Sequence, residues 1–209
     1  MNATEFPFET RQYTLGALIR LDVAKSQDMI VNISVTATQE YNIFAQLDAL
    51  KNTWYKLDFD VVNHKTRDTF KIVGFDKITQ VLDESLSTIN VMASSRYVKR
   101  YQKEVEDFQY SLNLISDCLE QWREAQRGWI YLENIFSSQD IKKQRPRDYQ
   151  DFEVINRNWA KMMKLVYMNR NVRKNTSAQR ISDFKKWNRV MEKIQKNLET
   201  YLEEKRSYF

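Results

Sequence analysis

The chain has 209 residues with a formal net charge of +5; 42% of the residues are hydrophobic and 29% are charged. These proportions exclude an intrinsically disordered chain, and the sequence has no run of about 18 apolar residues that could span a membrane. Because only three glycines and two prolines interrupt it, the composition favours long helices.

The cysteine content and the first residues bear on the compartment. Cys118 is the single cysteine, so an internal disulfide is excluded. Glu5, Glu9 and Arg11 precede any apolar stretch, which argues against a signal peptide. We therefore expect a reduced, cytoplasmic setting.

The N-terminal region is predicted to contain one long helix. We expect residues 1–12 to form a flexible arm, and residues 13–23 are apolar but too short for periodicity to distinguish a helix from a strand. Ser26 is a candidate N-cap for a helix that ends near Lys56. The residues expected on one face of this helix are Ile33, Ala37, Glu40, Phe44, Leu47, Leu50, Trp54 and Leu57.

The hydrophobic period then changes from that of a helix to that of a strand. Apolar and polar residues alternate on both sides of a polar segment, which predicts a β-hairpin at residues 57–73. His64, the only histidine, falls in its predicted turn, where we expect a solvated side chain. A helix from Asp76 to about Met92 follows, and a serine among residues 93–95 is expected to cap the next one.

The segment from Ser95 to Pro146 has the strongest pattern in the chain. It predicts an amphipathic helix of roughly 40 residues with one buried face. The apolar residues of that face recur at alternating spacings of three and four: Tyr101, Val105, Phe108, Leu112, Ile115, Leu119, Trp122, Ala125, Trp129, Leu132 and Phe136.

Two more helices are predicted after a turn at residues 137–145. Pro146 suits the first turn of a helix that ends near Asn169. Residues 171–177 are expected to form a loop, and a last helix begins near Ala178. The aromatic pair Tyr208-Phe209 at the end is typical of a sequence that continues further.

Together these elements predict a mainly α fold, an elongated irregular bundle of about five helices with one small β-hairpin. We expect two subdomains, residues 13–94 with the hairpin and residues 95–209 with the long helices, the second truncated at its C-terminus. The residues expected to act as structural anchors are Trp54, Trp122, Trp129, Leu132, Phe136, Pro146, Phe152 and Trp159.

The sequence offers no set of catalytic residues. It has neither a G-x-x-x-x-G-K-[ST] loop nor a G-x-G-x-x-G motif, and one histidine cannot build a histidine-based metal site or a Ser-His-Asp triad. We therefore predict no enzymatic activity, no cofactor and no metal for this chain. Tyr131 lies one position off the long apolar face and is the candidate for contact with a partner.

The basic residues gather near the C-terminus. Residues 139–209 contain eighteen Lys and Arg against nine Asp and Glu. Such a balance suits an acidic partner or nucleic acid, but no aromatic and basic motif accompanies it, which disfavours nucleic acid.

One motif resembles a known family. The stretch Gln126–Phe136 reads QRGWIYLENIF and is followed by Asp140-Ile141, then by QRPRD at residues 144–148 and by Phe152. This series resembles the linker region of dynein heavy chains, with Arg145 in place of a leucine and Asp148 in place of a glutamate. Weaker matches occur at Trp54, at Ser95 and Tyr97, and between Ile194 and Arg206.

The resemblance implies a mechanical role. It suggests the N-terminal half of a helical arm that joins the tail of a dynein to its AAA+ ring and swings as the ring hydrolyses ATP. The implied partners are that ring and the rest of the linker, without direct nucleotide binding, and microtubules are reached only through the full-length motor. Ser137-Ser138 resembles the axonemal branch, which implies a cytoskeletal location in a cilium or flagellum.

A second interpretation of the same helices remains open. A stand-alone helical scaffold of the spectrin-like or coiled-coil type would also show long apolar faces. The predicted hairpin and the five tryptophans argue against it.

Overall fold

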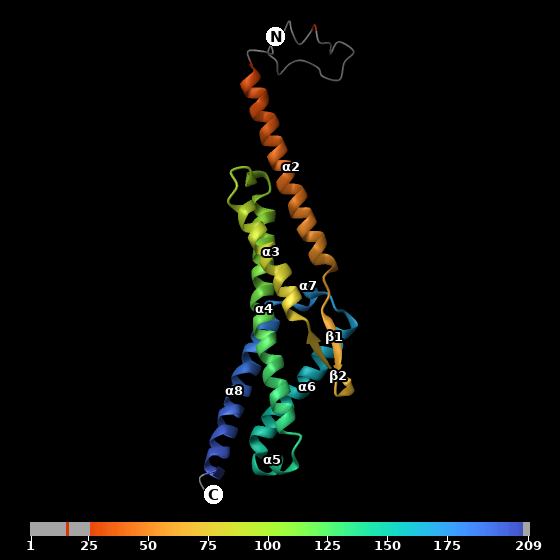
Figure 1. The fold of residues 1–209 in the computed structure, drawn as a ribbon, viewed down its shortest axis with the longest axis vertical. Coiled ribbons are helices and arrows are strands. Elements are labelled where there is room, and N and C mark those ends of the chain that lie inside the picture. Colours follow the sequence, from red (N-terminus) through yellow and green to blue (C-terminus); the bar gives the residue numbers. More distant parts are fainter. Residues whose placement is uncertain (1–15, 17–25, 207–209) are drawn as a thin grey trace.

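The computed structural model describes residue 16 and residues 26–206, and it confirms the prediction of a mainly α fold with one small hairpin. Long helices run along the long axis of an elongated molecule, with the hairpin beside its middle (Figure 1). The elements are α2 (Gln27–Lys56), β1 (Asp60–His64), β2 (Thr66–Val73), α3 (Phe75–Ala93), the 3-10 turn η3 (Val98–Arg100), α4 (Gln102–Ile135), α5 (Gln139–Gln144), α6 (Pro146–Met168), α7 (Val172–Asn175) and α8 (Ala178–Arg206).

The central element is α4, as the sequence predicts. Its N-terminal half packs against α3 and its C-terminal half against α8, while α6 lies alongside (Figure 1). From Val105 to Leu132, every apolar residue of the predicted face is at most 5% exposed, and Tyr101 before it is half-buried. The alternating spacing of three and four keeps those side chains on one face, which the neighbouring helices cover.

The bounds predicted for α2 are right, but only the C-terminal half of the face predicted to be buried is covered. Leu47 and Trp54 are buried, whereas Ile33 is 62% exposed and Phe44 is 46% exposed. The physical reason is that α2 projects past the connection between α3 and α4 (Figure 1). Ser26 stands at the N-cap position, but its side chain makes no capping hydrogen bond.

The starts of α3 and α4 also differ from the prediction. Gly74 adopts a left-handed conformation with φ of 69°, so α3 begins directly after it and not at a capping Asp76. No serine caps α4, because η3 intervenes and Tyr101 stands at the N-cap position.

In the C-terminal half, α6 and α8 begin where the sequence predicts, at Pro146 and Ala178. The predicted turn at 137–145 contains the short helix α5, and the predicted loop at 171–177 contains α7. Asn171 caps α7 by accepting a hydrogen bond from the backbone N–H of Lys174 at 3.2 Å.

One cluster of buried apolar residues extends from Ile43 on α2 to Leu198 on α8 and so crosses the predicted subdomain boundary near residue 94. The division into two subdomains stays a prediction. The predicted arm at residues 1–12, the pair Tyr208-Phe209 and, apart from residue 16, the apolar segment 13–23 lie outside the described residues. None of the helices described is long and apolar enough to cross a membrane.

Candidate functional site

The hairpin is the place where segments distant in sequence meet. Its strands are antiparallel, with Val61 opposite Ile72, and the chain turns at Lys65, which has a positive φ of 53°. Phe59, Val61, Phe70 and Ile72 are all buried, so one face of this two-stranded sheet packs on the helices. A two-stranded hairpin is marginal in isolation, and this one therefore depends on that packing.

The outer edge of β2 is bonded to side chains of two helices. Gln126 on α4 accepts a hydrogen bond from the backbone N–H of Ile72 at 2.8 Å and donates one to its carbonyl at 2.8 Å. Trp159 on α6 donates to the carbonyl of Phe70 at 3.3 Å. A strand edge leaves unpaired backbone groups, and here α4 and α6 satisfy them, which fixes the hairpin to both helices.

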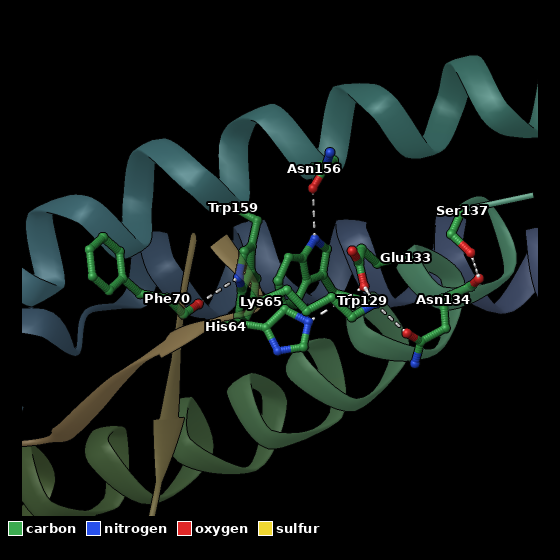
Figure 2. A network of polar contacts seen from close by, with 9 residues as sticks. All are labelled: His64, Lys65, Phe70, Trp129, Glu133, Asn134, Ser137, Asn156 and Trp159. Carbon is green, nitrogen blue, oxygen red and sulfur yellow. Dashed lines mark hydrogen bonds and ion pairs between the residues drawn. The ribbon is translucent and has the colours of Figure 1, made fainter. Parts of the chain in front are cut away.

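The tip of the hairpin is held by the end of α4, as Figure 2 shows. Lys65 Nζ lies 2.5 Å from Glu133 Oε2 and 2.5 Å from Asn134 Oδ1, and His64 Nε2 lies 3.4 Å from the same Glu133 oxygen. The prediction of a solvated His64 is wrong: this residue is 7% exposed and its ring centre lies 5.0 Å from that of Trp129. The chain turns one residue later, at Lys65, so His64 points inward.

Aromatic rings connect the hairpin, α4, α6 and α8. Trp129 and Trp159 stack with their ring centres 5.0 Å apart and an interplanar angle of 16°. Trp129 also donates a hydrogen bond from Nε1 to Asn156 Oδ1 at 3.0 Å (Figure 2). Successive ring contacts of 4.9 to 6.5 Å join Phe59, Trp122, Phe184, Trp187, Trp159, Trp129 and His64. Such pairs add stabilisation beyond the area that they bury.

The end of α2 is fixed by the segment between α6 and α7. Phe59 donates its backbone N–H to the carbonyl of Arg170 at 2.8 Å, and Val172 donates to that of Leu57 at 2.9 Å. The Asn171 side chain adds a bond to the carbonyl of Tyr55 at 2.9 Å. Residues 55–59 are therefore held at the point where α2 passes into the hairpin.

The predicted anchor residues lie mostly in the core. Those at most 2% exposed are Trp54, Trp122, Trp129, Leu132, Phe136, Phe152 and Trp159. Trp54 donates to Ser85 Oγ at 3.0 Å and so connects α2 to α3. Pro146 differs from them, because it is exposed and serves only to begin α6.

The predicted partner contact, Tyr131, is 44% exposed. It borders a groove of about 380 Å³ between α4 and α8, with Glu124, Glu192 and Glu199 on its walls. The groove floor includes Gly128, where an added Cβ would lie 3.3 Å from Met191 Cε. The two helices thus approach closely at Gly128 and leave Tyr131 at the rim.

Arg145 and Asp148, the two residues beside Pro146 that differ from the motif named in the sequence analysis, contact each other. Arg145 Nη2 lies 2.6 Å from Asp148 Oδ2, and the Asn197 side chain on α8 donates to Asp148 Oδ1 at 2.8 Å. Asp148 is only 6% exposed. This buried carboxylate therefore has its partners and connects the start of α6 to α8.

The region where the hairpin and the end of α2 are bonded to α4, α6 and the segment before α7 is called the joint. Sequence reasoning missed its polar residues. Gln126, Glu133, Asn156 and Asn171 each bond to a segment at least 27 positions away in the chain. Gln126, Glu133 and Asn156 stand beside residues of an apolar face, which is the only local signal that they carry. Their hydrogen-bond partners depend on which helices and strands lie side by side in the fold. A local sequence pattern carries no information about this arrangement.

Among the described residues, one side chain on the buried face of α4 has a pKa far from its ordinary value. Burial raises the pKa of the Cys118 thiol to about 11. Burial is also the main reason that the pKa of the nearby Arg180 is lowered. No group of three or more His, Cys, Asp or Glu residues within the described ranges is arranged to hold a metal ion.

The fold and the joint define a helical structural module, in which a hairpin and a chain of aromatic rings fix long helices to one another. The sequence matches, over residues 1–209, the family model described as dynein heavy chain, N-terminal region 2. The chain belongs to this dynein heavy chain family, which confirms the resemblance found in its sequence.

The relatives are much longer proteins. The chain is 34% identical over 206 residues to the dynein-1-beta heavy chain of the flagellar inner arm I1 complex of Chlamydomonas reinhardtii, covering 98% of this chain and 4% of that protein. It is 32% identical over 206 residues to human dynein axonemal heavy chain 2, covering 98% and 5%. With mouse dynein axonemal heavy chain 1 it shares 32% identity over 197 residues, covering 94% and 5%. The chain therefore spans about one twentieth of the length of these relatives.

Proposed function

We propose that this chain is part of the mechanical linker of a dynein heavy chain, a lever arm that transmits ATP-driven changes in the AAA+ ring to the tail. The observation that carries the proposal is the joint at the hairpin. There, Gln126 on α4 and Trp159 on α6 both bond to the backbone edge of β2.

A lever must transmit force between its ends without bending at its joints. The passage from α2 into the hairpin is a natural place for a hinge, because a helix ends there at Lys56. Backbone hydrogen bonds from Phe59 to Arg170 and from Val172 to Leu57 hold this connection in position. Each such hydrogen bond contributes about 0.5–1.5 kcal/mol net. Bending at the joint would break several of them together, so the joint resists force.

The proposal assigns the chemistry to other parts of the heavy chain. It places ATP hydrolysis in the ring and microtubule contact in other regions of the heavy chain, and these 209 residues contain no G-x-x-x-x-G-K-[ST] motif. The partners of this segment are the ring of the same heavy chain and the remainder of the linker.

The names of the relatives support a location. The relatives named above are described as axonemal or as part of a flagellar inner arm. We place the parent protein in the axoneme of a cilium or flagellum, as part of the cytoskeleton.

The test changes one joint residue in a full-length heavy chain that contains this segment. Gln126→Ala removes both bonds to Ile72, whereas Gln150→Ala, at an exposed position on α6, is the matched control. We expect Gln126→Ala to slow microtubule gliding several-fold while the ATPase rate of the ring changes little. Equal gliding velocities in both variants would contradict the lever proposal.

Tyr131 is proposed as part of the surface that meets the ring. It is exposed on α4 at the rim of a groove that is lined by both acidic residues and Arg127, and an exposed tyrosine at such a rim suits contact with a partner. Tyr131→Ala should weaken binding of the arm to a ring that lacks its linker, whereas Tyr110→Ala, 70% exposed on the same helix, should not. Identical affinities for the two variants would remove Tyr131 from the interface.

A further inference from the structure

The N-terminal half of α2 and the connection between α3 and α4 form the two walls of an open groove. Its volume is about 670 Å³. Ile33, Ala37 and Glu40 line it from α2, and Arg96 and Tyr97 line it from the connection. Figure 1 shows α2 extending past this connection, so the α2 wall continues beyond the groove.

The α2 wall is largely apolar. Residues 29–39 contain no Asp, Glu, Lys or Arg, so three turns of the helix carry no charge on any side. Met29 is 55% exposed and Ile33 is 62% exposed. A helix surface that faces water normally carries charged residues, so this wall has the composition of a surface that a partner covers.

The opposite wall is basic. Residues 85–103 contain no Asp or Glu and four exposed cations, which are Arg96, Lys99, Arg100 and Lys103. Arg100 faces α2, because its Nη1 lies 3.7 Å from Glu40 Oε2. Glu40 is the one carboxylate among the described residues that line the groove, and it is therefore already matched by Arg100.

The other carboxylates of this region leave the basic wall without a partner. Asp28 stands in the first turn of α2, and Glu104, Glu106 and Asp107 stand on α4. None of these four lines the groove, and Glu104 is paired with Lys51 at 2.7 Å. The groove thus has an excess of positive charge, which comes from Arg96.

Arg96 is already positioned for an acidic partner. Its guanidinium carbon lies 4.7 Å from the ring centre of Tyr97, and its Nη2 donates a hydrogen bond to the Tyr97 hydroxyl. Among the residues that the structure describes, no carboxylate is paired with Arg96. A planar guanidinium that a ring already holds loses little conformational freedom when it binds a carboxylate.

We propose that this groove binds an amphipathic helix supplied from outside these 209 residues, with apolar side chains towards α2 and carboxylates towards Arg96. A helix has no free backbone edge, so α2 must recognise its partner through side chains. The apolar positions Ile30, Ile33 and Ala37 follow the spacing of three and four that packs against a second helix. The uncharged run of eleven residues extends about 16 Å, which matches about three turns of a partner.

The charge of the connection decides which kind of helix fits. A basic helix would meet Arg96 and Arg100 and be repelled, whereas an acidic flank pairs with the unmatched guanidinium. The inference is independent of the proposed lever function, because it concerns binding to this segment alone.

The test is binding of a designed peptide to the 209-residue chain, measured by fluorescence anisotropy. The probe is a stapled helix of about 14 residues, with leucines at spacings of three and four and glutamates along one flank. The comparison peptide has lysines in place of the glutamates. We expect the acidic probe to bind with a dissociation constant of about 1–100 μM, and the basic peptide to bind at least about ten times more weakly.

Two pairs of variants locate the binding surface. Ile33→Asp should weaken binding of the acidic probe at least about tenfold, because it places a charge on the apolar wall. Val35→Asp is the matched control, since Val35 is 42% exposed on the same helix and does not line the groove. Arg96→Glu should weaken binding of the acidic probe and strengthen binding of the basic peptide, whereas Arg189→Glu, at an exposed position on α8, should leave this preference unchanged.

Circular dichroism of all variants establishes that they remain folded. Absence of saturable binding up to about 1 mM probe would overturn the proposal. Equal affinities for the two peptides, or equal affinities of Ile33→Asp and Val35→Asp for the acidic probe, would also overturn it. A chain that sediments as a dimer and becomes monomeric on Ile33→Asp would show that a second copy covers this face instead.

Discussion

The two halves of α2 carry the same apolar periodicity and meet different surroundings. In the C-terminal half, Leu47 and Trp54 are fully buried against the body of the molecule. In the N-terminal half, Met29 and Ile33 are more than half exposed among the described residues. The difference shows that an apolar pattern indicates a face that requires a partner, without indicating which segment supplies it.

The tryptophans of the joint around the hairpin are fully buried, unlike the exposed N-terminal half of α2, and a substitution there should have the largest effect on stability. Trp129 is fully buried, stacks on Trp159 and donates to Asn156, so Trp129→Ala should lower the free energy of unfolding by about 3–5 kcal/mol. Urea denaturation monitored by circular dichroism measures this loss. Tyr110→Ala, exposed on the same helix, should change it by about 0.5 kcal/mol or less. A similar loss of stability for both variants would contradict the assignment of one buried and one exposed face to α4.

A pair of substitutions compares the halves of α2 directly. Leu47→Ala should cost about 2–5 kcal/mol, because it leaves a cavity in the covered half. Ile33→Ala should be close to neutral, because Ile33 is 62% exposed and Ala has the higher helix propensity. A cost for Ile33→Ala as large as that for Leu47→Ala would show that the N-terminal half of α2 is covered as well.

The buried thiol predicts how the stability of the covered region depends on pH. The pKa of Cys118 rises from 9.0 to about 11 on folding, because burial disfavours the thiolate. Below pH 9 both states are protonated and the stability contribution is fully present; it is lost as the pH rises from about 9 to about 11. The loss is about 2–3 kcal/mol at the upper limit.

Comparison with Cys118→Ala isolates this thiol from the Lys and Tyr residues that titrate in the same range. The melting temperature of the natural sequence should fall more steeply between pH 9 and 11 than that of the variant. Parallel curves would show that Cys118 is not desolvated and that the inner face of α4 is less well packed than the structure describes.

The smallest effect concerns the close approach of α4 and α8. Gly128→Ala should change stability by less than about 1 kcal/mol, because the gain in helix propensity is offset by displacement of Met191 Cε, 3.3 Å from the new Cβ. Gly128→Leu should cost about 1–3 kcal/mol, since the longer side chain forces the helices apart. Thermal unfolding of both variants is the measurement. A neutral Gly128→Leu variant would show that this crossing is loosely packed.

Several elements could be predicted from the sequence because their signals are local. The single face of α4, the proline that begins α6 and the change of period at the hairpin depend on residues a few positions apart. Local irregularities were harder to predict. The 3-10 turn before α4 and the short helices α5 and α7 occupy segments whose composition only excluded long helices.

Local patterns were enough to predict the helical class, the bounds of α2, the starts of α6 and α8 and, through the motif from Gln126 to Phe152, the dynein heavy chain family. The tertiary structure was needed to show that His64 is buried against Trp129 and that Gln126 and Trp159 bond to the edge of β2. The physical reason is that helix formation depends on interactions between near neighbours, whereas burial and edge pairing require residues 54 to 89 positions apart to meet.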